Sequence, residues 1–140
     1  MKPFKFENLR VWQLALEYVD LMYRLAEGLP MNEQYNLASQ LIPNRSSKTM
    51  FDAPIYICVQ NMAFRIVIDM IRAATSITLN IAEGSTGQSD SEQRHFLGMA
   101  LRSLIETVAC QRLMARRNYI SNVGVLETGN QQAHELARAL

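Results

Sequence analysis

The apolar positions between Val11 and Ala26 recur at steps of three and four residues, which is the spacing of one face of a helix. The polar residues that fall on the remaining face recur at the same steps and are Arg10, Gln13, Glu17, Asp20, Arg24 and Glu27. Gly28 and Pro30 follow, as is typical at and after a helix C-terminus. The pattern predicts an amphipathic helix whose apolar sector is wide enough to meet neighbours on two sides.

A second, shorter helix is predicted from Asn32, a favourable N-cap, to Ile42, because Pro43 ends it. Its apolar face consists of Tyr35, Leu37, Ala38, Leu41 and Ile42. Residues 43–48 then predict an exposed loop, and residues 52–54 predict the start of another helix.

Residues 55–81 carry an apolar stripe with steps of three or four throughout, formed by Ile55, Val59, Met62, Ile66, Met70, Ala73, Ile77 and Ile81. The β-branched runs 55–59 and 64–68 around residues 60–63 also allow a β-hairpin. The stripe continues in phase into residues 72–83, which favours one helix from about Pro54 to Glu83.

Two further helices are predicted in the last third of the chain. One starts at Ser89 or Asp90 and runs to about Asn118, and a weaker one runs from about Asn122 to Leu140. The fold class is therefore all-α, a small helical bundle forming a single domain over residues 1–140.

Composition narrows the class of protein further. The chain has 140 residues, of which 49% are hydrophobic and 19% charged, with a net charge of +1. These values indicate one globular domain and exclude both a disordered chain and a strongly basic DNA-coating protein. No signal peptide and no membrane span is expected, so we expect a cytoplasmic protein without membrane contact. Cys58 and Cys110 are expected to be buried, reduced thiols.

Patterns typical of enzymes are weak. Glu92 and His95 form one Glu-x-x-His pair of the kind that helical bundles use for di-iron sites, but His134 lacks a glutamate three residues before it. Residues 84–87 lack the lysine of a phosphate-binding loop, and no nucleophile motif is present. We therefore expect no catalytic residues, no metal and no cofactor.

One helix face between residues 72 and 83 is polar. Arg72, Ser76, Asn80 and Glu83 lie at spacings of four, four and three. The face is either simply solvated or part of a polar network, inside the bundle or between subunits, in which Arg72 or Asn80 pairs with a carboxylate such as Glu83 or Glu106.

A basic patch is the second candidate site. Arg112, Arg116 and Arg117 lie within two helical turns, and Arg10 is a further exposed cation candidate. The arginines either complement the helix dipole or contact phosphates of a nucleic acid, with Tyr119 placed to stack on a base. Repetition of the patch in a symmetric ring would make a continuous positive surface.

Several motifs together resemble a known family. They are the segments Phe6–Ala15, Glu33–Gln40, Arg72–Ile77 and Asn80–Gly84, followed by Phe96-Leu97, Ala100, Ser103-Leu104 and Glu106. These segments resemble the bacterial four-helix-bundle proteins encoded in intervening sequences of large-subunit ribosomal RNA genes. The Arg-Ala pair followed by Asn-Ile-Ala-Glu-Gly is the most specific element.

The resemblance implies an up-down antiparallel four-helix bundle, a homo-oligomer that is often a pentameric ring, and no catalysis. The family is also similar to accessory variability proteins of diversity-generating retroelements, which implies binding to RNA and to a reverse transcriptase. This chain departs from the family pattern by an insertion at residues 43–71. Its 29 residues amount to about eight turns, so the insertion keeps the helical phase and is expected to split the second helix.

The sequence thus predicts a non-catalytic oligomeric scaffold that binds RNA or DNA, with structured RNA favoured, through pooled basic patches. The alternative is a protein-interaction module whose partner docks on the first helix or on residues 51–68.

Overall fold

In the computed structural model of the chain, residues 3–27, 53–87, 89–120 and 122–140 are described. All regular structure in these ranges is helical. A 3-10 helix, η1 (Lys5–Asn8), precedes α1 (Arg10–Glu27), α3 (Ala53–Thr86), α4 (Asp90–Arg116) and α5 (Val123–Ala139). The prediction of an all-α helical bundle is confirmed. The predicted helix Asn32–Ile42 and the loop after it lie outside the described residues.

The segment that allowed either a hairpin or a helix is a helix. α3 runs unbroken from Ala53 to Thr86, so the interpretation based on the continuous apolar stripe is confirmed and the β-hairpin alternative is wrong. α3 also continues three residues past the predicted end at Glu83, and Gly84 in its last turn is buried beside Phe96 of α4.

The other helices begin and end close to their predicted positions, for local reasons that the structure shows. Ser89 caps α4 by accepting a hydrogen bond from the Glu92 N–H at 3.2 Å, and Asn122 caps α5 by accepting one from the Val125 N–H at 3.3 Å. At the end of α4, Asn118 adopts a left-handed backbone with φ 56°, which lets the chain turn toward α5.

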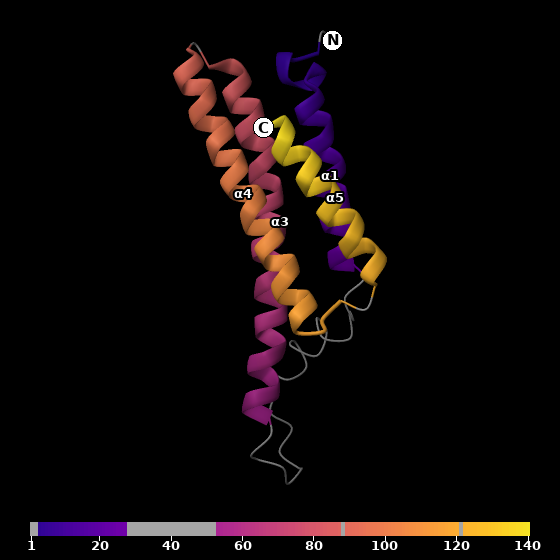
Figure 1. Ribbon diagram of the computed structural model, residues 1–140. Coiled ribbons are helices and arrows are strands. Elements are labelled where there is room, and N and C mark those ends of the chain that lie inside the picture. Colours follow the sequence, from indigo (N-terminus) through magenta and orange to yellow (C-terminus); the bar gives the residue numbers. More distant parts are fainter. Residues whose placement is uncertain (1–2, 28–52, 88, 121) are drawn as a thin grey trace.

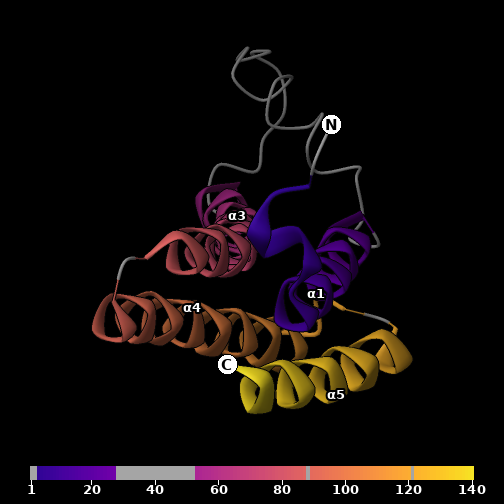
Figure 2. The same ribbon diagram turned by 90° about the horizontal axis from the view of Figure 1, so that it is seen from above.

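Neighbouring described helices point in opposite directions in Figure 1: α1 descends from the N-terminus, α3 rises, α4 descends and α5 rises. α3 and α4 form the most extensive helix pair, while α5 packs mainly against α1 and less against α4 (Figure 2). The largest fully buried apolar side chains come from all four helices and are Tyr18, Met22, Met70, Ile77, Ile81, Met114 and Leu136.

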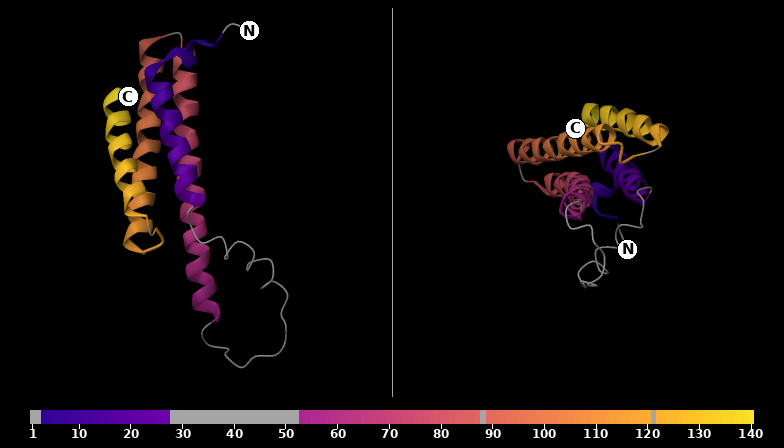
Figure 3. Two further views of the ribbon diagram at one scale, coloured as in Figure 1. Left: turned by 90° about the vertical axis from the view of Figure 1, so that its right-hand side faces the viewer. Right: turned by 90° about the horizontal axis from the view of Figure 1, so that it is seen from below.

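α3 is longer than the bundle that surrounds it. Ser76 faces Ser103 and Gly84 faces Phe96, a register that brings the end of α4 level with about residue 64 of α3. At 1.5 Å per residue, the first part of α3 extends about 16 Å beyond α4. Figure 3 shows this overhang projecting from one end of the molecule.

None of the described helices combines the length and the apolar character that crossing a membrane requires.

Candidate nucleic-acid interface

The last two turns of α4 present three arginines to solvent. Arg112, Arg116 and Arg117 are all exposed, and their guanidinium groups take part in no hydrogen bond or ion pair with the parts of the chain that are described. Their backbone is fixed, because the Arg117 N–H donates to the Leu113 carbonyl at 3.0 Å. We call Arg112, Arg116 and Arg117, at the end of α4, the arginine end. Hydrogen bonds of the helix hold their backbone in place, and no acidic side chain of the described residues pairs with them.

Tyr119 lies directly after the turn at Asn118. Its N–H donates to the Met114 carbonyl at 2.9 Å, and its ring is half-buried against the core. The ring therefore supports the turn beside the arginine end, and only its uncovered part remains for a stacking role.

Arg10 lies at the other end of the molecule. It begins α1, whereas the arginine end closes α4, and these points are at opposite ends of the bundle in Figure 1. The Arg10 guanidinium forms an ion pair with Glu135 of α5 at 3.5 Å, and both side chains remain substantially exposed. α1 and α4 both start at the same end of the bundle, but Arg10 lies at the start of α1 and the arginine end lies at the end of α4. One copy of the chain therefore does not bring all four predicted arginines into one patch.

The predicted polar face on α3 is divided in the structure. Ser76 and Asn80 lie against α4: the Asn80 amide donates to the Ser76 carbonyl at 2.7 Å and to the Ser76 hydroxyl at 3.0 Å. The Ser103 hydroxyl of α4 donates to the Ser76 hydroxyl at 3.0 Å, which joins the two helices. We call these three residues the rim cluster.

Arg72, Glu83 and Glu106 do not join the rim cluster. All three are exposed, and within the described part of the chain none of them forms an ion pair. The expected pairing of Arg72 or Asn80 with Glu83 or Glu106 is therefore not made within one copy, since the Asn80 amide bonds to its own helix instead. Pairing between subunits stays a prediction.

A second polar cluster, which the sequence analysis missed, lies in the core. The Tyr18 hydroxyl lies 2.8 Å from the Thr107 hydroxyl and accepts a hydrogen bond from the Gln111 amide at 2.7 Å. The same amide lies 3.2 Å from the Met22 sulfur. We call Tyr18, Thr107 and Gln111 the core cluster. Burial raises the pKa of the Tyr18 hydroxyl, although its bonds to Thr107 and Gln111 counteract this.

α5 covers the core cluster closely. The Gln111 Oε1 atom is buried and has no hydrogen-bond partner among the described residues, and a Cβ atom added at Gly129 would lie 2.8 Å from it. Glycine at this position is what allows α5 to pack over the amide. The signal in the sequence was the pair of polar residues, Thr107 and Gln111, on the otherwise apolar face of α4.

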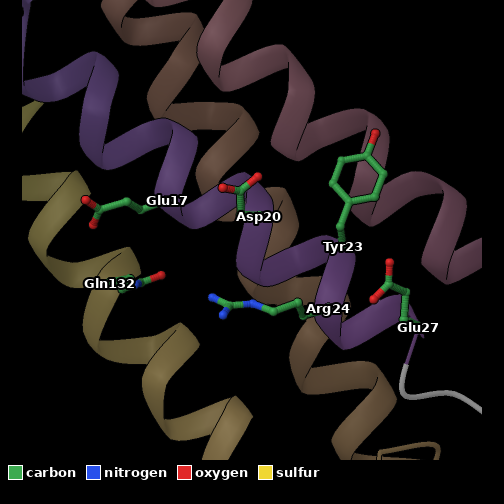
Figure 4. A pocket seen from close by; sticks show the side chains of 6 residues that line it. All are labelled: Glu17, Asp20, Tyr23, Arg24, Glu27 and Gln132. Carbon is green, nitrogen blue, oxygen red and sulfur yellow. The ribbon is translucent and has the colours of Figure 1, made fainter.

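An open pocket of about 610 Å³ lies along α1 where it faces α5, and Figure 4 shows the side chains that line it. These are Glu17, Asp20, Tyr23, Arg24, Glu27 and Gln132. Three carboxylates against one guanidinium make this surface unsuited to phosphates, and none of the predicted site residues lines it.

The Glu-x-x-His pair has a local structural role. Glu92 lies in the first turn of α4, where an acidic side chain complements the helix dipole, and the His95 ring lies 5.9 Å from the Phe96 ring. No group of three potential metal ligands is present among the residues with described positions.

A family model described as 23S rRNA-intervening sequence protein matches residues 54–140, well over half of the chain. The chain belongs to this family. The match includes the segment Arg72–Gly84 and the arginine end, and it begins inside residues 43–71, so the extent of the expected insertion stays a prediction. No curated protein matches the chain.

Proposed function

We propose that this protein is a non-catalytic, oligomeric helical scaffold that binds structured RNA through arginine ends pooled from several copies. The observation that carries the proposal is the arginine end itself: three exposed guanidinium groups within six residues, with no acidic side chain of the described residues in contact with them. Such groups contact phosphates and thereby position a nucleic acid without reading its sequence.

Family membership supports RNA over DNA as the ligand, because the family takes its name from a ribosomal RNA. A protein of net charge +1 gains little affinity from its overall field, so local patches must supply the binding energy.

Exposed apolar side chains support self-association. On α4, Ile105 is 62% exposed and Leu101 and Leu113 are also accessible, and on α3 Leu79 is 55% exposed. An outer surface of this kind on an isolated chain is typical of an interface. In a closed ring, such as the pentamer that the resemblance implies, each copy would add three arginines to one surface.

Binding to a structured RNA hairpin, followed by fluorescence anisotropy over a series of salt concentrations, tests this proposal. The variant with Arg112, Arg116 and Arg117 all changed to Gln should lose most of its affinity. The slope of log K against log salt should fall by about two to three for each copy in contact, since three phosphate contacts are removed.

A matched control changes the exposed Arg94, Arg102 and Arg138 together to Gln, which removes the same charge elsewhere. The control should retain binding. If both triple variants lost the same RNA affinity, net charge alone would account for binding and the arginine end would be rejected as the site. If the unchanged protein had no RNA affinity at low salt, the whole proposal would be rejected.

A second candidate function, a protein-interaction module, is favoured by the overhang of α3. Residues 53–64 contain no charged residue, and Met62, Phe64 and Ile68 are exposed. A reverse transcriptase is the partner implied by the similarity to retroelement accessory proteins. Recovery of a protein partner after nuclease treatment, and its loss in a Phe64→Glu variant, would favour this function.

A further inference from the structure

The first described residues form an aromatic stack that ends at the surface. The Phe4 and Phe6 rings are parallel, with centroids 5.8 Å apart and an angle of 8° between their planes. The Phe6 ring in turn meets the Trp12 ring edge-on at 4.6 Å. Phe4 is 61% exposed, so one flat aromatic ring backed by two others faces solvent.

The stack is held in place by hydrogen bonds of the backbone. The Glu7 N–H donates to the Phe4 carbonyl at 3.1 Å, and the Leu9 N–H donates to the Phe6 carbonyl at 3.0 Å. The Gln13 side chain of α1 donates to the Glu7 carbonyl at 2.9 Å. η1 also packs against both α1 and α3, between which it lies in Figure 2. The exposed ring is therefore part of an ordered structure.

Phe4 is not a core residue, because most of its surface stays in contact with water. An exposed ring in a fixed orientation is the arrangement with which proteins stack on unpaired bases, since every base offers a π-face and the ring loses little entropy on binding. Lys5 next to it is an exposed cation that suits the phosphates flanking such a base, and Arg10 at the start of α1 keeps an 85% exposed side chain although it pairs with Glu135.

We propose that Phe4 is a stacking platform for an unpaired base of the RNA, a contact separate from the phosphate contacts of the arginine end. The inference rests on the proposed function and adds a ligand feature to it: the preferred RNA carries a bulged or looped-out base. α1 spans about 27 Å between the two ends of the bundle, so platform and arginine end engage different parts of the RNA.

The test uses an RNA hairpin with 2-aminopurine as its single unpaired bulge, a fluorescent base that is quenched on stacking. The protein should quench it on binding, and it should bind the bulged hairpin more tightly than a fully paired hairpin of equal length. Phe4→Ala should abolish the quenching and weaken binding of the bulged RNA about tenfold, while its affinity for the paired hairpin stays unchanged.

Two conservative variants separate stacking from general apolarity. Phe4→Trp should restore both the quenching and the affinity, whereas Phe4→Leu, which keeps an apolar side chain but no π-face, should resemble Phe4→Ala. Because Phe4 is largely exposed, the melting temperatures of these variants should stay close to that of the unchanged protein.

The outcomes distinguish the two proposals. If the unchanged protein binds both hairpins and Phe4→Ala binds them equally well, the platform is rejected and the arginine end stands. If Phe4→Leu retains full quenching and affinity, stacking is likewise rejected. If the unchanged protein binds neither RNA at low salt, both proposals fall.

Discussion

The core cluster and the rim cluster are built from the same chemical groups, hydroxyls and one amide, but they differ in access to water. Tyr18, Thr107 and Gln111 are all buried, whereas in the rim cluster only Asn80 is buried, at 6% exposure, and Ser76 and Ser103 are both half-exposed. Water replaces a hydrogen bond lost at the rim, but it does not reach one lost in the core. The core cluster should therefore affect stability far more than the rim cluster.

The sharpest test of this difference exchanges an amide for a carboxylate in each cluster. Gln111→Glu should lower the free energy of unfolding at pH 7 by about 3 kcal/mol or more, because a charged carboxylate would replace an amide that is fully buried in the core. Asn80→Asp should cost less, about 1–2 kcal/mol: Asn80 is itself buried and loses its donor to the Ser76 carbonyl, but the neighbouring Ser76 and Ser103 are half-exposed, so water can approach the new charge. Urea denaturation of both variants measures the costs, and equal values would contradict the comparison.

The cost of Gln111→Glu should also depend on pH. Burial raises the pKa of the new carboxyl in the folded state above its value of about 4.3 in the unfolded chain. A raised folded-state pKa means that stability is complete below the unfolded value and is lost as pH rises. The variant should therefore regain stability between pH 7 and pH 5, whereas Asn80→Asp, whose neighbours Ser76 and Ser103 are half-exposed, should regain less.

Removal of single hydroxyls gives a smaller contrast. Tyr18→Phe should lower the free energy of unfolding by about 1–2 kcal/mol, because the Gln111 amide loses its 2.7 Å acceptor. Ser103→Ala should cost no more than about 0.5 kcal/mol, because water reaches the Ser76 hydroxyl. A double-mutant cycle of Tyr18→Phe with Thr107→Val should show coupling, and additive effects would argue against a connected core cluster.

Replacing Gly129 by alanine tests how closely α5 covers the core cluster, and the same replacement at Gly98 of α4 is the control. Gly129→Ala should destabilise the protein by about 1 kcal/mol, because the added Cβ would displace the buried Gln111 amide and thereby strain its bonds. Gly98 lies on the exposed face of α4 with no atom within 4 Å of an added Cβ, so Gly98→Ala should stabilise by about 0.5–1 kcal/mol. Thermal denaturation measures the opposite signs.

The smallest effect concerns alkaline pH. Burial, together with the negative charges of Glu106 and Asp69, raises the pKa of the Cys110 thiol, and burial does the same for Tyr18. Raised values mean that stability is lost as pH rises above the ordinary thiol range of about 8.5, and further above the tyrosine range of about 10. Cys110→Ala should remove the first loss and Tyr18→Phe the second, as measured by melting temperature between pH 7 and pH 10.5.

The two clusters also show what the sequence revealed and what it did not. Ser76 and Asn80 are four residues apart on one helix, so local spacing placed them together. Tyr18 and Gln111 are 93 positions apart, and only the packing of α1 against α4 brings their side chains into contact. Periodicity identifies which residues share a face, but it does not specify which faces meet.

The limit of periodicity, which does not specify which helix faces meet, also explains why the predicted pairing of the charged residues is not found within one copy. The spacing of Arg72 and Glu83 grouped them correctly with Ser76 on α3, yet the register with α4 leaves both exposed. Likewise, Arg10 and the arginine end were each predicted as basic positions, but the direction of their helices separates them. The helix over residues 55–81 was predictable because its stripe stays in phase for more than seven turns.

The packing of α1 against α5 has a consequence for the order in which the helices come together during folding. α3 ends at Thr86 and α4 begins at Asp90, so only three positions of the sequence separate the two helices, and their pairing closes a short loop at little entropic cost. The contact of Arg10 with Glu135, in contrast, encloses a loop of 125 positions, which forms only after the intervening chain has been organised. We therefore expect the α3–α4 hairpin to form early in folding and the contact between α1 and α5 to form late.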